Sequence, residues 1–154
     1  KKICIVPEKR KEITTEGGLN IKANASILKK NLKLLFENNV DVSLFIDPNL
    51  ENIKRVEGLG ISSVELHTGQ YANANLEEER QYLDKIAEVT CYAKNIGMSV
   101  RAGHGLTYSK VKSLLDISGI EELNIGHFII GEAIFKGLDN VIYKMLELIK
   151  KKNK

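Results

Sequence analysis

Short runs of apolar and β-branched residues recur along the chain, and a longer stretch with helical spacing follows each of them. Each run is soon followed by Gly, Pro, Asp or His, as is usual where a strand ends. The five runs are Ile3–Val6, Val40–Ile46, Ser63–Leu66, Met98–Val100 and Leu123–Ile125. Strands that alternate with helices are typical of parallel βα units. The sequence therefore predicts an α/β protein built on a parallel sheet.

Apolar residues spaced three and four apart predict the helices between these strands. The longest of them stops near Gly97, which is a usual helix end. A further segment lies between Gly126 and Gly137 and has the length of a short extra helix. The predicted helices cover Ile27–Phe36, Leu76–Ala93, Val111–Leu115, Phe128–Phe135 and Val141–Ile149.

Length and the first turn favour a barrel over an open sheet. A complete (β/α)₈ (TIM) barrel takes about 250 residues, so the 154 residues of this chain correspond to about five of its eight units. An open nucleotide-binding sheet would carry a Gly-rich turn after its first strand, whereas this strand is followed by Pro7-Glu8-Lys9-Arg10. We expect residues 1–154 to form one domain, about five eighths of a barrel.

Composition excludes several other classes of protein. The hydrophobic fraction of 43% and charged fraction of 28% are those of a globular domain, and no apolar run approaches the length of a membrane span. Cys4 and Cys91 are too few for a disulfide framework or a zinc knuckle, which favours a cytoplasmic location. The net charge of +3 and the scattered tyrosines do not indicate a nucleic-acid partner.

Alternation along the strands predicts a polar inner surface. In Val64-Glu65-Leu66-His67 the two apolar residues share one face, so Glu65 and His67 share the other and point toward the barrel axis. By the same parity Asp47, Arg101 and Asn124 also point inward. A buried charge needs a partner. We therefore expect the side chains of Glu65 and Arg101 to approach each other.

All three histidines follow the ends of predicted strands. His67, His104 and His127 thus fall at the carboxyl-terminal face, where barrel enzymes place their chemistry. A single histidine is more often structural, but three at the same end favour an active site. A metal site is less favoured, because the helical His-x-x-x-His pair is absent and flanking glycines suit contacts from the backbone to a ligand.

Glycines in two of these loops indicate an anion site. Gly103 and Gly105 flank His104, Gly126 precedes His127, and a predicted helix follows each loop. Glycine lets backbone N–H groups approach an anion at a helix N-terminus, although tight turns alone would also explain these residues. Barrels commonly bind phosphate with the loops after strands seven and eight. On that basis the chain would supply strands 4 to 8.

Six motifs, in one order across nearly the whole chain, resemble the pyridoxine 5′-phosphate synthase family. They include the polar segment that follows the first strand and the loops that carry the histidines. The motifs are Ile5-Val6-Pro7-Glu8-Lys9-Arg10, Thr14-Thr15-Glu16-Gly17-Gly18-Leu19, Val42-Ser43-Leu44-Phe45-Ile46-Asp47, Glu65-Leu66-His67-Thr68-Gly69, Ala102-Gly103-His104-Gly105-Leu106 and Glu122-Leu123-Asn124-Ile125-Gly126-His127.

The resemblance implies a cytoplasmic, octameric barrel enzyme that uses no metal or organic cofactor. Such an enzyme condenses 1-deoxy-D-xylulose 5-phosphate with 3-amino-2-oxopropyl phosphate to close the pyridine ring of vitamin B6. Carried over by motif, His104 would be a general acid and Glu65 would stabilise cationic or imine-like intermediates. Thr14 would contact the sugar phosphate. The phosphate of the amino ketone would be held by Gly105, Gly126 and His127.

The chain also departs from the family pattern. The family's first three βα units carry a further histidine, a glutamate base and phosphate-binding arginines, and we expect these units to be missing here, which would leave this chain alone inactive. Arg101 stands where an asparagine is commoner. Two alternatives stay open: another phosphosugar barrel enzyme, such as an aldolase or isomerase, and a catalytically incomplete half-barrel that binds phosphate.

Overall fold

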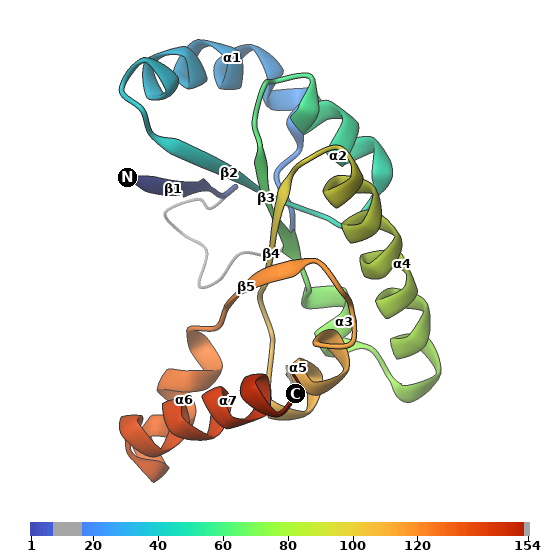
Figure 1. Cartoon of the computed structure of the whole chain (residues 1–154), viewed down its shortest axis with the longest axis vertical. Helices are drawn as coiled ribbons and strands as arrows, with labels where there is room; N and C mark the ends of the chain where they lie inside the picture. The colour runs from blue at the N-terminus through green and yellow to red at the C-terminus, as the bar shows by residue number, and fades with distance from the viewer. Residues whose placement is uncertain (8–16, 153–154) are drawn as a thin grey trace.

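One parallel sheet organises the molecule (Figure 1). The structure is a computed structural model that describes residues 1–7 and 17–152. Each strand lies next to its predecessor in the chain, so the sheet order is β1-β2-β3-β4-β5 and every pair is parallel. A strictly sequential order is that of a barrel, whereas an open doubly wound sheet reverses direction at a switch point. The strands are β1 (Lys2–Ile5), β2 (Asp41–Ile46), β3 (Ser63–His67), β4 (Ser99–Gly103) and β5 (Ile120–Asn124).

Helices connect the strands, and polar residues cap several of their N-termini. The side chains of Asn20, Asn49, Asn75 and Thr107 each accept a hydrogen bond from a backbone N–H of the first turn. The helices are α1 (Ile21–Glu37), α2 (Leu50–Glu57), α3 (Gly69–Asn73), α4 (Leu76–Asn95), α5 (Tyr108–Leu114), α6 (His127–Lys136) and α7 (Leu138–Lys152).

The predicted elements are confirmed, and two helices were not expected. All five strands are present, and β4 extends to Gly103 rather than stopping at Val100. The predicted extra helix is α6, which ends at Lys136 with Gly137 as its C-cap. Helix α1 begins at Ile21, six residues before the apolar spacing indicated, because Asn20 caps it there. The unexpected helices are α2 and α3.

The apolar face of the sheet packs against helices to form the core. Leu44, Val64, Leu66 and Val100 are fully buried, and α4 contributes Ile86 to the same cluster. Figure 1 shows α2 and α4 on the same side of the sheet. Burial of this face fixes the register of each strand, since a shift by one residue would expose it. The residues of opposite parity are thereby placed on the other face.

The second face of the sheet is polar, as predicted. Phe45 is paired with Glu65 across β2 and β3, and Glu65 is paired with Arg101 across β3 and β4. The expected Glu65–Arg101 ion pair is not among those formed by the described residues. Arg101 instead contacts Asp41 at 3.4 Å and Glu122 at 3.7 Å. The long guanidinium side chain thus reaches a carboxylate on the adjacent strand β5 and one on β2, beyond β3.

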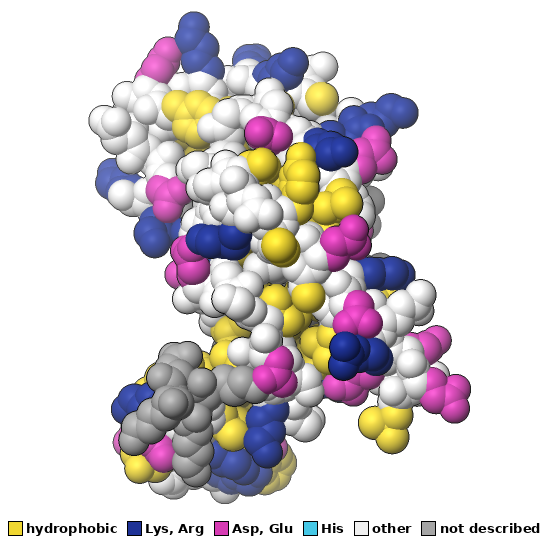
Figure 2. All heavy atoms as spheres, turned by 45° about the vertical axis from the view of Figure 1, so that its right-hand side comes forward, with side chains coloured by type: hydrophobic (Ala, Val, Ile, Leu, Met, Phe, Trp, Pro, Cys, Tyr) yellow, Lys and Arg dark blue, Asp and Glu magenta, His cyan; other side chains and the backbone are white. Residues whose placement is uncertain are grey.

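The outer surface shows no dominant charge on the face in Figure 2. Lys and Arg side chains are interspersed there with Asp and Glu side chains. Among residues 1–7 and 17–152, no helix is long and apolar enough to cross a membrane.

Candidate active site

A pocket of about 500 Å³ lies at the carboxyl-terminal ends of the strands. It brings together five of the six residues predicted for the site, from the end of β3, the loop after β4 and the start of α6. The sixth, Thr14, lies outside the residues that the structure describes. The pocket is lined by Val6, Phe45, Glu65, His104, Gly105, Leu106, Thr107, Asn124, Ile125, Gly126, His127 and Phe128.

The loop after β4 holds His104 in an unusual backbone conformation. His104 has a φ of 87°, in the left-handed region that residues other than glycine avoid, and Gly105 follows with a φ of 72°. Such a conformation costs about 1–3 kcal/mol and persists only where its surroundings fix it. Thr68 provides that support, because its Oγ1 lies 2.7 Å from the carbonyl oxygen of Gly103 and 2.6 Å from that of His104. The arrangement presents the imidazole at the pocket.

The surroundings of His104 favour the neutral form of its ring. Burial lowers the pKa of His104 below its ordinary value, and the nearby rings of His67 and His127 lower it further. A buried imidazole resists the charged form, and neighbouring rings that can become cationic add to this effect. The neutral ring can accept a proton, and the protonated ring, which is populated below the lowered pKa, can donate one in acid–base catalysis.

Glu65 occupies the inner face of β3 beneath the pocket. Its side chain is buried, and its Oε2 accepts a hydrogen bond of 2.7 Å from Asn124 Nδ2 of β5. Gly103 makes room for it, since a Cβ at that position would lie 2.6 Å from Glu65 Oε1. A buried carboxylate that accepts a hydrogen bond from a neutral amide can stabilise positive charge on a bound molecule.

The N-terminus of α6 opens into the same pocket. Gly126 is the N-cap residue and offers no side-chain cap, so the first backbone N–H groups of α6 lack that partner. A Cβ at Gly126 would meet no atom within 4 Å, which leaves open space beside the backbone. N–H groups that have no side-chain cap and the helix dipole together suit a phosphate group.

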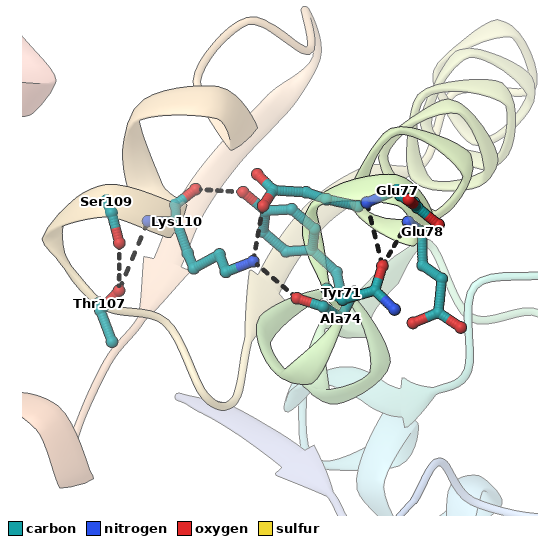
Figure 3. Close-up of polar contacts among 9 residues, drawn as sticks. Tyr71, Ala74, Glu77, Glu78, Thr107, Ser109 and Lys110 are labelled. Carbon is teal, nitrogen blue, oxygen red and sulfur yellow. Dashed lines mark hydrogen bonds and ion pairs between the residues drawn. The ribbon is translucent and has the colours of Figure 1, made fainter.

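A polar brace of Lys110, Glu79 and Tyr71 holds α5, which follows the His104 loop, against the segment after β3 (Figure 3). Lys110 Nζ lies 2.7 Å from Glu79 Oε2 and 3.5 Å from the carbonyl oxygen of Ala74. The hydroxyl of Tyr71 donates to the carbonyl oxygen of Lys110 at 2.7 Å, and burial raises the pKa of Tyr71 to about 12. The brace thus links α5, which follows the His104 loop, to α3 and α4, which follow β3.

Loss of the Lys110 charge is expected to destabilise the fold. The Lys110 and Glu79 side chains are only 16% and 20% exposed. In Lys110→Met the largely buried carboxylate of Glu79 would lose its ion-pair partner. The free energy of unfolding should therefore fall by about 1–3 kcal/mol. Lys33→Met is the matched control, because the Lys33–Glu37 pair is exposed on α1, and it should change stability by less than about 0.5 kcal/mol. Urea unfolding of the full-length natural protein measures both, and equal values would contradict the structural role of the brace.

Sequence reasoning gave no separate role to Thr68 or Gly69. Thr68 supports the His104 loop through its hydroxyl group. Gly69 makes room for the His104 ring, because a Cβ at this position would lie 3.1 Å from that ring. Both directly follow Glu65-Leu66-His67, so their position after a strand rich in functional groups was the available signal. Which loop they support depends on the pairing of β3 with β4.

The sequential parallel sheet, with a pocket at its carboxyl-terminal edge, is that of a barrel-type α/β protein. Solved structures share this fold. KGPDC from Streptococcus mutans superposes with a TM-score of 0.56 at 16% identity, covering 84% of this chain and 57% of that one. A mutant flavocytochrome b2 with pyruvate bound gives a TM-score of 0.54, also at 16% identity, covering 80% of this chain and 32% of the other.

Sequence comparison identifies the family. The family model described as "Pyridoxal phosphate biosynthesis protein PdxJ" matches residues 1–151, and the chain belongs to this family. The pyridoxine 5′-phosphate synthase of Sulfurihydrogenibium sp. is 46% identical over 147 residues, covering 96% of this chain and 60% of the relative. That of Gluconobacter oxydans is 47% identical over 146 residues, covering 95% and 61%. The chain therefore spans about 60% of the length of these curated relatives.

Proposed function

We propose that this chain supplies part of the active site of a pyridoxine 5′-phosphate synthase. In that reaction 1-deoxy-D-xylulose 5-phosphate condenses with 3-amino-2-oxopropyl phosphate, and the pyridine ring closes with loss of phosphate and water. The observation that carries the proposal is the pocket in which His104, Glu65 and the uncapped N-terminus of α6 meet, in a chain that belongs to the PdxJ family.

The pocket residues suit the steps of this reaction. His104 is proposed as the general acid for a departing oxygen, because imidazole exchanges protons near neutral pH. Glu65 is proposed to stabilise cationic or imine-like intermediates. Gly105, Gly126 and His127 would hold the phosphate of the amino ketone through backbone N–H groups, which add no competing nucleophile. Thr14 is proposed to contact the sugar phosphate.

The complete enzyme is proposed to be a (β/α)₈ barrel in which this chain forms strands 4 to 8. Within the described residues, β1 and β5 each have one strand partner, so both edges of the sheet are open. Unpaired edges are unfavourable in isolation, and the relatives are longer than this chain. We propose that turnover needs the remaining βα units and that the enzyme is a cytoplasmic homo-octamer.

The direct test is turnover of the two substrates by the full-length natural protein and by the 154-residue chain alone. Mass spectrometry should detect pyridoxine 5′-phosphate with the full-length protein only. Absence of product in both would exclude the synthase and favour a phosphate-binding half-barrel or another phosphosugar enzyme. Product from the 154-residue chain alone would overturn the proposed need for further units.

Replacement of Glu65 by glutamine is expected to lower kcat. The glutamine side chain would keep the size and the hydrogen-bond acceptor for Asn124 but would lose the negative charge, and electrostatic stabilisation of this kind is worth about 10²–10³-fold. Steady-state kinetics of the full-length protein measure the loss. Glu88→Gln, at an exposed position of α4, is the matched control and should leave kcat unchanged. A loss below about threefold in Glu65→Gln would contradict the proposed role.

A further inference from the structure

His67, the last residue of β3, packs against His104 without lining the pocket. It is buried, and its ring centroid lies 4.9 Å from that of His104 and 5.1 Å from that of Phe45. Its Nδ1 lies 3.0 Å from Oδ1 of Asp47, the residue after β2. Asp47, His67 and His104 therefore form a continuous row at the ends of three neighbouring strands, and only His104 reaches the pocket.

Asp47 determines which nitrogen of His67 carries the hydrogen. The hydrogen bond from His67 is the main cause that lowers the pKa of Asp47, and the backbone N–H of Gly18 donates to Oδ1 of Asp47 at 2.9 Å. An ionised carboxylate only accepts hydrogen bonds. Nδ1 of His67 therefore donates to Asp47, and the ring is held in one orientation.

The opposite edge of the His67 ring is buried beside His104. Nε2 of His67 has no hydrogen-bond partner among the described residues. A Cβ at Gly69 would lie 2.5 Å from this Nε2 and 3.1 Å from Cδ2 of His104, so both rings press against the same glycine. A buried polar atom without a partner costs free energy. A site that served packing alone would be filled more favourably by an apolar ring.

We propose that Asp47 and His67 form a positioning pair, in which the carboxylate fixes the His67 ring and this ring fixes the plane of the His104 imidazole at the pocket. The proposal rests on the proposed function only in assigning the proton transfer to His104. In the general arrangement a carboxylate orients an imidazole. Here the half-exposed carboxylate of Asp47 orients the ring of His67, and the ring of His67 in turn orients that of His104.

The proposal can be tested through the pKa of His104, because the charged groups around its ring affect that pKa. His67 of β3 and His127 of α6 both lower the pKa of His104. Glu65 lines the same pocket, and the contact of Asp47 with the His67 ring connects it to His104. Phenylalanine at position 67 would keep a flat ring against His104 and remove both the Nδ1 donor and the potential positive charge. The pKa of His104 should then rise toward its ordinary value.

The test compares Asp47→Asn and His67→Phe in the full-length natural protein, with Asp84→Asn at an exposed position of α4 as the control. NMR titration follows the His104 ring, assigned from the spectrum of His104→Gln, and kinetics give kcat and KM against pH. In His67→Phe the His104 midpoint should move to higher pH. In Asp47→Asn kcat should fall about 10- to 100-fold, because small misplacements of a reacting group have effects of this size, while KM changes less than about threefold.

Two results would overturn the positioning pair. One is a His104 titration in His67→Phe that coincides with that of the unmodified protein. The other is a kcat in Asp47→Asn within twofold of the unmodified value. If one variant fails to fold, the other decides the question by its own measurement. If the unmodified protein makes no pyridoxine 5′-phosphate, the proposed function fails, whereas the His104 titration still decides the positioning pair.

Discussion

Replacing His104 by alanine is expected to lower kcat of the full-length natural protein about 10²–10⁴-fold, the usual contribution of a general acid. The structure favours an effect of this size, because Thr68 and the two flanking glycines hold the backbone at a φ of 87° with the ring at the pocket. Steady-state kinetics with both substrates measure the change. A loss below about tenfold would reduce His104 to a positioning role.

The pH profile of the same variant separates acid catalysis from loss of a contact. A general acid acts in its protonated form, which is populated below its pKa. Because the pKa of His104 is lowered, kcat of the unmodified protein is expected to decline as pH rises through that lowered pKa. His104→Ala should lack this limb. Persistence of the same limb in the variant would assign it to another group.

The sheet and its polar face could be predicted from sequence because strand parity is a local property. Val64 and Leu66 alternate with Glu65 and His67 in four consecutive residues, and burial of the first two commits the others to the opposite face. In a parallel sheet with sequential order, the carboxyl-terminal ends of all strands lie along the same edge. Local pattern and topology together therefore place the histidines close to one another.

The partners of the inner charged groups could not be predicted in the same way. Glu65 and Arg101 are paired in register, but the Arg101 side chain contacts Asp41 and Glu122 instead. Glu65 accepts a hydrogen bond from Asn124. These contacts depend on side-chain length and on strands further along the sheet. The His67–Asp47 hydrogen bond is of the same kind, since it joins the ends of two strands.

Helices α2 and α3 were not predicted, because they are too short to show a clear helical spacing of apolar residues. Helix α2 buries only Ile53 and Val56, and α3 is five residues long. Asn49, which caps α2, was the available indication. Helix α3 nevertheless affects the site, because its Ala72 packs closely against the His104 loop. A Cβ at Gly105 would lie 2.6 Å from the Cβ of Ala72.

The second large effect is expected from Gly18→Ala, which should lower the free energy of unfolding by about 3 kcal/mol, the upper part of the range for overpacking. A Cβ at Gly18 would lie 2.1 Å from the backbone nitrogen of Asp47 and 2.6 Å from the carbonyl carbon of Ile46. Backbone atoms cannot rotate away as a side chain can. The end of β2 would have to shift, and with it the hydrogen bond from Gly18 to Asp47.

The neighbouring glycine provides the matched control for this prediction. A Cβ at Gly17 would meet no atom within 4 Å, so Gly17→Ala should change stability by less than about 0.5 kcal/mol. Urea unfolding of the full-length protein compares the two variants. Because Asp47 contacts His67, Gly18→Ala should also lower kcat under conditions where the variant is still folded, whereas Gly17→Ala should not. Equal stability of the two variants would contradict the close contact between Gly18 and the end of β2.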